Sequence, residues 1–237
     1  MASKLDIEIE GETKISAVHH KSDSDKWIFF CHGFGSNKEG SYEERCKHLQ
    51  KNGWNAVRFD FRGNGESDGE FINQNLSTRI EDLKSVVNYF EPESCVVYGS
   101  SFGGKVVFHF SAEDERVQAI IGRAPVTYNN IMSKFRAVIN EKGEFEYIDD
   151  KPIDQGFFDD FDQYNFSYVT DNLDIPVAIF HGDADTTVHT KNSFNAAQEL
   201  DTDVSLFKLK DEKHSFTENG ENFMREEMVS WLDNIEL

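Results

Sequence analysis

The sequence has few cysteines and no long apolar run. Its 237 residues include three cysteines, Cys31, Cys46 and Cys95, and none of them forms a Cys-x-x-Cys pair. This sparse, odd set excludes a disulfide-stapled fold and indicates a reducing compartment. No segment approaches the roughly 18 consecutive apolar residues of a membrane helix, and the first ten residues lack the basic and apolar regions of a signal peptide. We therefore expect a soluble, cytoplasmic protein.

Positive charge is also scarce. Lys and Arg total 24 against 44 Asp and Glu, which gives a formal net charge of −20. A field of this sign repels phosphate backbones and anionic membranes, so neither nucleic acid nor membrane insertion is expected. The aromatic content of 13%, with 21 Phe, argues against disorder. The length suits one large domain or two small ones, with a core that has room for a small-molecule pocket.

The hydrophobic pattern predicts an α/β fold with a doubly wound, mostly parallel sheet. Residues 5–20 alternate apolar and polar side chains around Gly11, which predicts an N-terminal antiparallel hairpin. Short apolar runs typical of strands buried on both faces then follow, at 27–31, 56–59, 95–98, 117–121, 177–180 and 204–209. Helical spacing separates them at 76–90 (with Ser77 or Thr78 as the N-cap), 101–112, 192–200 and 223–235.

The segment 126–172 interrupts this alternation. It mixes many aromatic and acidic residues without a long regular period. We expect it to form a small lid inserted into a core made of residues 1–125 and 173–237. A pair of helices that only packs on the core is the alternative.

A candidate nucleophile follows the third apolar run. The stretch Gly99-Ser-Ser-Phe-Gly103 matches Gly-x-Ser-x-Gly and places Ser101 at a strand-to-helix turn. Small residues on both sides allow such a turn to close, and the helix start offers the Phe102 backbone N–H to a developing oxyanion. A second N–H, that of Phe34, is expected from the glycine loop after the first apolar run.

A nucleophilic serine needs a base and an acid that orients the base. Among the eight histidines, His214 lies in a polar loop after the last apolar run, where the carboxyl ends of parallel strands bind ligands. Asp183 and Asp185 follow the preceding run at the same edge, and both are candidates for the acid. The chain order Ser, Asp, His is the one expected for this architecture.

Nucleotide-binding motifs are incomplete. The stretch from Gly99 to Lys105 resembles a phosphate-binding loop, but Val106 stands where Ser or Thr would reach a magnesium ion. The glycines at 63 and 65 lack the third glycine of a dinucleotide site, so Asp60 and Arg62 are expected to form a structural turn network. Neither a metal nor an organic cofactor is expected.

Taken together, these stretches resemble the α/β-hydrolase superfamily from about residue 25 onward. The resemblance rests on the His-Gly-x-Gly loop at 32–35, Asp-x-Arg-Gly-x-Gly at 60–65, the nucleophile turn at 99–103, His-Gly-x-x-Asp at 181–185 and the histidine at 214. It implies the catalytic triad Ser101, Asp185 and His214, and so favours Ser101 over Ser100 and Asp185 over Asp183. Within the superfamily, the size and compact lid resemble cinnamoyl and feruloyl esterases and monoacylglycerol-lipase-like esterases.

The expected function is hydrolysis of carboxylic esters through an acyl-enzyme. Four lid aromatics are candidates for a hydrophobic acyl or aryl pocket: Phe157, Phe158, Phe161 and Tyr164. Alternatively, these rings only attach the lid to the core. A peptidase, an acyl-peptidase or a thioesterase using the same triad, and a non-catalytic binding protein on this fold, remain alternatives.

Overall fold

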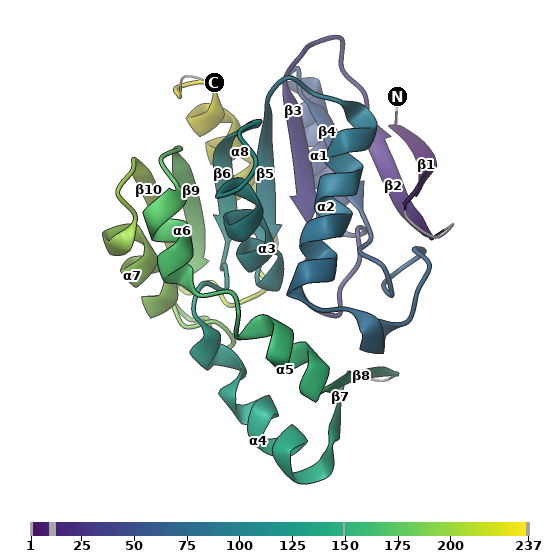
Figure 1. Ribbon diagram of the computed structural model, residues 1–237. Coiled ribbons are helices and arrows are strands. Elements are labelled where there is room, and N and C mark those ends of the chain that lie inside the picture. The colour runs from purple at the N-terminus through teal and green to yellow at the C-terminus, as the bar shows by residue number, and fades with distance from the viewer. Residues whose placement is uncertain (1, 10–12, 149, 236–237) are drawn as a thin grey trace.

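The computed structural model describes residues 2–9, 13–148 and 150–235 and is built around an eight-stranded sheet (Figure 1). The strand order is β1-β2-β4-β3-β5-β6-β9-β10. The strands are β1 (Ala2–Glu8), β2 (Lys14–His20), β3 (Trp27–Cys31), β4 (Asn55–Phe59), β5 (Cys95–Ser100), β6 (Val117–Arg123), β9 (Val177–Gly182) and β10 (Val204–Leu209). Each apolar run expected from the sequence is one of these strands.

The sheet is parallel from β4 to β10, and β1 and β2 are antiparallel, which confirms the predicted fold class. The turn expected at Gly11 lies outside the described residues. The chain runs from β3 to β4 on one side and then returns to β5 on the other side of β3. This reversal places the ends of β3 and β5 at a topological switch point, where open α/β sheets bind their ligands.

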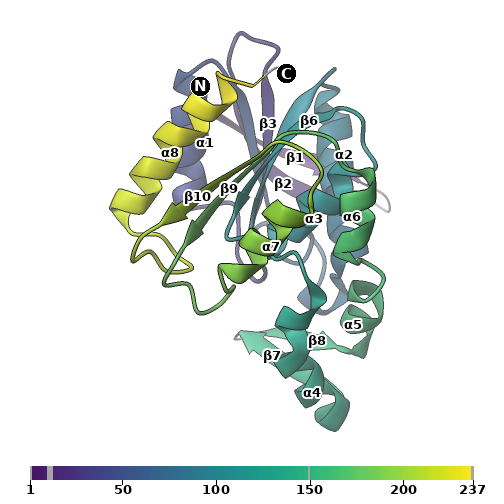
Figure 2. The same cartoon turned by 90° about the vertical axis from the view of Figure 1, so that its left-hand side faces the viewer.

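Helices cover both faces of the sheet (Figure 2). One face packs against α1 (Ser41–Lys51) and α8 (Glu218–Leu232). The other packs against α2 (Leu76–Phe90), α3 (Phe102–Ser111), α6 (Phe166–Asn172) and α7 (Lys191–Glu199). Side chains of β3 point alternately to the two faces: Ile28 and Phe30 pack on the side of α1 and α8, and Phe29 packs on the side of α2 and α3. This is the two-residue period of a strand. In the described part of the chain, none of the helices is sufficiently long and apolar to cross a membrane.

The N-cap of α2 and the start of α8 are the helix features that depart most from the expected ones. The N-cap of α2 is Asn75, not Ser77 or Thr78, and its side chain and that of Thr78 form a reciprocal capping box. Helix α8 begins at Glu218 rather than near Phe223, because Thr217 caps a polar first turn that carries no hydrophobic signal.

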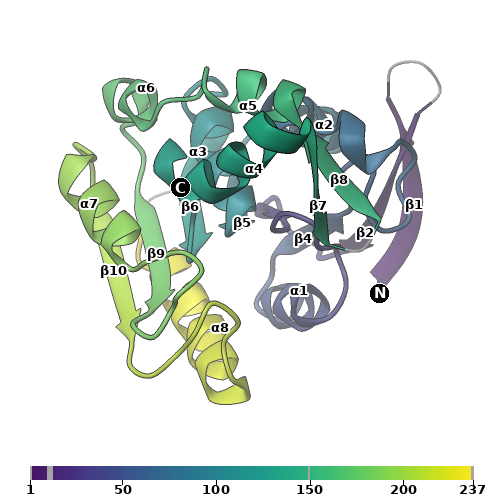
Figure 3. The same ribbon diagram turned by 90° about the horizontal axis from the view of Figure 1, so that it is seen from below.

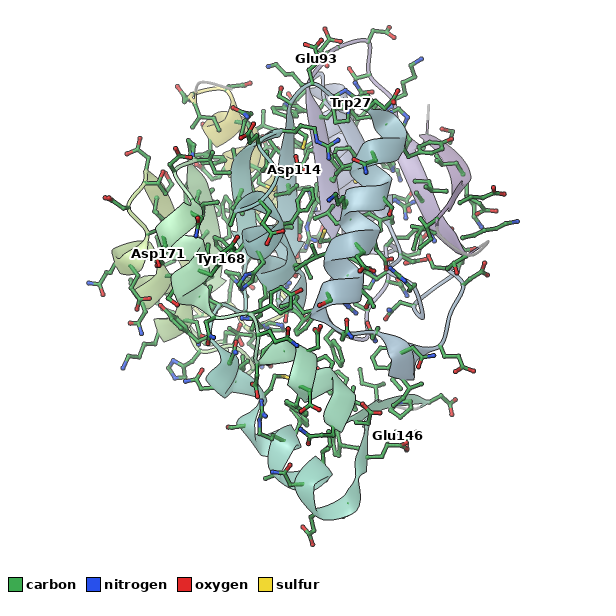
Figure 4. The ribbon with its side chains drawn as sticks, viewed as in Figure 1. Trp27, Glu93, Asp114, Glu146, Tyr168 and Asp171 are labelled. Carbon is green, nitrogen blue, oxygen red and sulfur yellow. The ribbon has the colours of Figure 1, made fainter. Side chains whose placement is uncertain are left out.

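The segment 126–172 lies mostly below the carboxyl ends of the strands (Figures 1 and 3). It contains the short 3-10 helix η3 (Asn129–Met132), α4 (Ser133–Lys142), the hairpin β7 (Glu144–Ile148) and β8 (Lys151–Asp154), α5 (Gln155–Phe161) and α6. Neither the hairpin nor the 3-10 helix η2 (Phe71–Asn73) was expected from the sequence. In Figure 4, Glu146 on β7 marks this end of the molecule, and Trp27 and Glu93 mark the opposite end.

Polar contacts connect this segment to the core. Asp160 of α5 accepts hydrogen bonds from the Leu76 and Ser77 backbone N–H groups at 2.8 and 3.1 Å, and so caps α2 from outside that helix. Lys105 of α3 is fully buried, and its Nζ donates to the carbonyl oxygens of Thr127 at 3.1 Å and Tyr164 at 2.7 Å. One ammonium group therefore connects both ends of the inserted segment to α3.

Candidate active site

Ser101 occupies a strained turn between β5 and α3. Its backbone has φ 54° and ψ −119°, an unusual conformation for a residue with a Cβ atom. The turn is tightly packed: a Cβ on Gly99 would lie 2.3 Å from the Gly103 carbonyl oxygen, and one on Gly103 would lie 2.4 Å from that of Cys31. These contacts explain why glycine is required on both sides of the serine. The strain holds the Ser101 side chain at the edge of the sheet, where it lines a cavity.

His214 and Asp185 form a close pair at the same edge. Nδ1 of His214 lies 2.7 Å from Oδ2 of Asp185. The other carboxylate oxygen, Oδ1, accepts the backbone N–H groups of Thr187 at 2.8 Å and Val188 at 3.0 Å. With Nδ1–H donated to the carboxylate, Nε2 of His214 is the nitrogen available as a base.

The Asp185 carboxylate is fully buried and stays ionised. Burial raises its pKa, but hydrogen bonds from His181 and His214 outweigh burial and leave the pKa below its usual value. Asp183 lies two residues earlier and is not in this network. Its Oδ1 accepts the Asp211 backbone N–H at 2.7 Å, and its Oδ2 lies 3.4 Å from Lys208 Nζ. The structure thus brings His214 to Asp185 and not to Asp183.

Phe34 and Phe102, whose backbone N–H groups were expected to bind an oxyanion, line the same cavity as Ser101. The N–H of Phe102 belongs to the first residue of α3, where no intrahelical acceptor exists. Within the described residues, neither this N–H nor that of Phe34 has a hydrogen-bond acceptor. The two rings pack with their centroids 5.1 Å apart. An unpaired N–H at a helix start, such as that of Phe102, favours negative charge nearby.

A neutral histidine supports the loop that carries Phe34. His32 is buried, and burial lowers its pKa well below the usual value, so the ring is uncharged. Its Nδ1 lies 2.8 Å from the Gly33 carbonyl oxygen, and its Nε2 accepts the Phe61 backbone N–H at 3.2 Å. These bonds fix the path of the glycine loop.

Beneath the two phenyl rings lies Arg79, a buried residue that the sequence analysis did not identify. Its guanidinium carbon is 5.3 Å from each of the ring centroids of Phe34 and Phe102. Burial lowers its pKa to about 9, and its Nε and Nη2 both donate to the Gln74 Oε1. It contributes a positive charge to the support of the loop.

Two cavities meet at Ser101, Phe34, Tyr147 and Thr187. One, of about 370 Å³, is mainly apolar and extends under the inserted segment. Its lining includes Phe102, Val126, Ile131, Met132, Phe135 and Val188. The other, of about 360 Å³, has a polar lining that includes Ser36, Ser41, Arg45, Arg123, His214 and Glu221.

The four aromatic residues proposed for the acyl pocket line neither cavity. Phe157, Phe158 and Phe161 are at most 2% exposed and belong to the hydrophobic core. Phe157 and Phe161 pack against the Phe102 ring, with centroids 5.8 Å away in both cases. The fourth, Tyr164, hydrogen-bonds to Ser77 with its hydroxyl. The aromatic side chains of the segment that do line the apolar cavity are Phe135 and Tyr147.

Three charged residues of the polar cavity were also not identified from the sequence. Arg45 on α1 makes a two-pronged ion pair with Glu221 on α8, with distances of 2.6, 2.8 and 3.1 Å. Arg123, the last residue of β6, donates to Ser100 Oγ and to the His214 carbonyl oxygen. Its position at the carboxyl end of a strand was a usable signal in the sequence.

The expected turn network around Asp60 is present in the structure. Asp60 accepts hydrogen bonds from the Lys38 backbone N–H and Nζ, both at 2.6 Å, and from the Glu66 backbone N–H. Arg62 pairs with Asp82 at 2.6 Å. These contacts hold the loop after β4 and lie outside both cavities.

The sheet, its switch point and the strained serine turn define an α/β hydrolase. Residues 22–143, just over half of the chain, match the family model described as "Serine aminopeptidase, S33", and the chain belongs to this family.

Curated relatives differ in how much of the chain they cover. A 31.7 kDa Escherichia coli protein from the traX–finO intergenic region is 29% identical over 124 residues, 50% of this chain and 43% of the relative. The chain thus spans less than half the length of that relative. Human mitochondrial palmitoyl-protein thioesterase ABHD10 is 26% identical over 215 residues, 82% of this chain and 68% of the relative.

Solved structures share the fold. Est1E from Butyrivibrio proteoclasticus, solved with bound ferulic acid, superposes with a TM-score of 0.85 at 20% identity, covering 96% of this chain and 97% of Est1E. At this level of identity the likeness concerns the fold.

Proposed function

We propose that this protein hydrolyses carboxylic esters through an acyl-enzyme, with Ser101 as nucleophile, His214 as base and Asp185 as the acid that orients the base. The observation that carries the proposal is the 2.7 Å contact between Asp185 and His214, at a cavity that Ser101 also lines. A strained serine and an oriented imidazole at one edge of the sheet are the elements that acyl transfer needs.

The reaction follows from these positions. His214 Nε2 takes the Ser101 hydroxyl proton as the oxygen attacks the ester carbonyl. The resulting imidazolium donates that proton to the leaving oxygen, and the acyl group stays on Ser101. Water then attacks the acyl-enzyme, with His214 again acting first as base and then as acid, and the carboxylic acid is released. The ionised Asp185 stabilises the imidazolium in both halves of the reaction.

The Phe34 and Phe102 backbone N–H groups are proposed to hold the oxyanion. Their lack of other acceptors among the described residues supports this role. Removing one such donor in a serine hydrolase costs about 2.7–4 kcal/mol of transition-state stabilisation. The two N–H groups together would therefore contribute on a scale comparable to the side chains of the triad.

We further propose that residues 126–172 form a lid and that its apolar cavity receives the acyl group. The lining of Ile131, Met132, Phe135 and Tyr147 supports a hydrophobic acyl or aryl group of small to medium size. Phe157, Phe158 and Phe161 would act indirectly, by supporting the Phe102 ring from behind.

Thioester hydrolysis is the second candidate, because the human relative is named a palmitoyl-protein thioesterase. The same triad would serve, with a thiolate as leaving group. Peptidase activity has less support: Glu221, the carboxylate that lines the polar cavity in the described part of the chain, is already paired with Arg45, so it is not free to bind a substrate ammonium.

The test uses a fluorophosphonate probe and p-nitrophenyl butyrate. The wild type should label and hydrolyse the ester, and Ser101→Ala should do neither while keeping the wild-type circular dichroism and melting temperature. Ser230→Ala, an exposed serine on α8, is the control and should behave as the wild type. Full activity in Ser101→Ala would refute the mechanism. Absence of both labelling and turnover in the wild type would favour a non-catalytic binding protein, and a panel of thioesters and peptide nitroanilides would rank the other substrate classes.

The cysteines support a reducing compartment. Cys31, Cys46 and Cys95 are all buried and unpaired. We propose a cytoplasmic location on this basis, although the human relative carries a mitochondrial designation.

A further inference from the structure

We infer that the two cavities at Ser101 receive different halves of the substrate. His214, which must protonate the leaving atom, lines only the polar cavity. Phe102, whose N–H is proposed to bind the carbonyl oxygen, lines only the apolar cavity. Since the acyl carbon lies between the two groups, the leaving group extends into the polar cavity and the acyl chain into the apolar one. This assignment rests on the proposed function.

The polar cavity carries a net positive charge. Among the described residues that line it, the ionic ones are Arg45, Arg123 and Glu221, all at most 9% exposed. Glu221 forms an ion pair with Arg45, through three hydrogen bonds of 2.6 to 3.1 Å. Arg123 Nε lies farther from Glu221, at 3.7 Å. The cavity therefore holds two cations and one anion.

Arg123 directs its hydrogen bonds to uncharged oxygens. Nη1 donates to Ser100 Oγ at 2.8 Å, and Nη2 donates to the His214 carbonyl oxygen. Within the described residues, its Nε has no hydrogen-bond partner. Its counter-charge is Glu221 at 3.7 Å, which Arg45 binds at shorter distances, so two buried guanidinium groups share one carboxylate.

This local charge opposes that of the whole protein, which is −20. The interaction of a buried cation with a bound anion is strong, because the effective dielectric constant there is low, and salt screens it weakly. Salt screens the interactions of the surface charges much more. Serine hydroxyls of Ser36, Ser41 and Ser215 also line the cavity and add hydrogen-bond donors.

We propose that the polar cavity binds a leaving group that carries a carboxylate, with Arg123 as the residue that selects it. The substrates would be esters, or thioesters, formed on the hydroxyl or thiol group of an organic acid. Arg45 and Arg123 share Glu221, and the shorter contacts of that carboxylate go to Arg45, so one positive charge remains in excess at Arg123.

The experiment compares two butyrate esters that differ only in charge, those of 4-hydroxybenzoate and of 4-hydroxybenzamide. The ratio of their kcat/KM values is measured in 1 M NaCl, where the Debye length is about 3 Å and the surface field is suppressed. The wild type should prefer the anionic ester about tenfold, which corresponds to about 1.4 kcal/mol. Arg123→Gln should bring the ratio to about one.

Two further variants separate charge selection from a structural effect. Loss of the hydrogen bond from Arg123 to the His214 carbonyl oxygen should slow hydrolysis of both esters by the same factor. The ratio of the two kcat/KM values therefore reports only the effect of the charge. Glu221→Gln removes the carboxylate that lines the cavity among the described residues and should raise the ratio above that of the wild type. Arg116→Gln, at the residue just before β6 and paired with Asp114, changes the net charge equally and should leave the ratio unchanged.

A binding measurement makes the result independent of turnover. Ser101→Ala, studied by calorimetry, should bind 4-hydroxybenzoate at least fivefold more tightly than 4-hydroxybenzamide, and adding Arg123→Gln should remove the difference. A wild-type ratio of one or below, with equal binding of the two phenols, overturns the inference while Ser101-dependent hydrolysis leaves the proposed function standing. Failure of the wild type to hydrolyse either ester or to react with the probe overturns the proposed function, and with it this substrate class.

Discussion

One carboxylate oxygen of Asp185 accepts a hydrogen bond of 2.7 Å from the His214 imidazole, and the other accepts hydrogen bonds from two backbone N–H groups. The backbone of its own loop thus positions the carboxylate independently of the histidine. It also lies 3.3 Å from Nε2 of His181, a buried ring that hydrogen-bonds to Ser193 and to the Val188 carbonyl oxygen.

This geometry distinguishes two neighbouring aspartates. Asp185→Asn should lower kcat for p-nitrophenyl butyrate by about 10⁴-fold, because an amide stabilises the wrong tautomer of the histidine. Asp183→Asn is the matched control and should change kcat less than threefold, since the Asp183 carboxylate pairs with the Asp211 backbone N–H and with Lys208 rather than with His214. Steady-state kinetics of the two variants decide the assignment, and an equal loss in both would contradict it.

The strain at Ser101 should be measurable as stability. Ser101→Gly should raise the free energy of unfolding by about 1 kcal/mol, because relief of about 1–3 kcal/mol of backbone strain exceeds the entropic cost of glycine, about 0.5–1 kcal/mol. Ser101→Ala keeps the Cβ atom and should be as stable as the wild type. Urea unfolding monitored by circular dichroism gives both values. A Ser101→Gly variant less stable than Ser101→Ala would show that the turn is not strained.

Lys105 should make stability depend on pH. Burial lowers its pKa from 10.5 to about 7, so between these values the unfolded chain binds more protons than the folded one. Stability should therefore rise as the pH increases from 7 to 10, relative to a Lys105→Met variant in which this dependence is absent. Urea unfolding of both proteins at pH 7, 8.5 and 10 provides the comparison, and parallel curves would contradict the prediction.

Lys105→Met should also be less stable at every pH in that range. It leaves three oxygens without their donor: the buried carbonyl of Thr127, and the part-buried carbonyl of Tyr164 and side chain of Asn129. The expected loss is about 2–4 kcal/mol, given about 1–3 kcal/mol for each unsatisfied group and partial relaxation. Lys84→Met, an exposed position on α2, is the control and should stay within about 0.5 kcal/mol of the wild type.

Chain-length preference should respond to the apolar cavity. Ile131→Trp adds bulk to the cavity wall and should lower kcat/KM for p-nitrophenyl octanoate by about tenfold or more, while the value for the acetate stays within about twofold. Phe194→Trp, at an exposed position on α7, is the control. Equal losses for acetate and octanoate would place the acyl chain outside this cavity.

The strands were predictable because burial on both faces leaves a short, continuous apolar signature. Trp27–Cys31 and Val204–Leu209 match β3 and β10 at both ends. The helix at Leu76–Phe90 was predicted to the residue from its spacing, but its cap was not, because Asn75 and Thr78 are both good capping residues and only the geometry selects between them.

The inserted segment was the least predictable part of the fold. The β7–β8 hairpin is short and carries acidic residues between its aromatic ones, so neither period of two nor of 3.6 is sustained. Counting aromatic residues indicated a hydrophobic pocket but could not distinguish Phe157, which packs behind Phe102, from Phe135, which lines the cavity. That distinction depends on which way each helix faces.

The order of strands and helices, the serine turn with its flanking glycines, and the candidates His214 and Asp185 were all readable in the chain, because each depends on a few neighbouring residues. The resemblance already favoured Asp185, but only the tertiary structure shows its 2.7 Å contact with His214, and it alone brought Arg45 of α1 to Glu221 of α8 beside Arg123. Such contacts join residues far apart in the chain, and their distances follow from how the helices pack on the sheet, which no local pattern encodes.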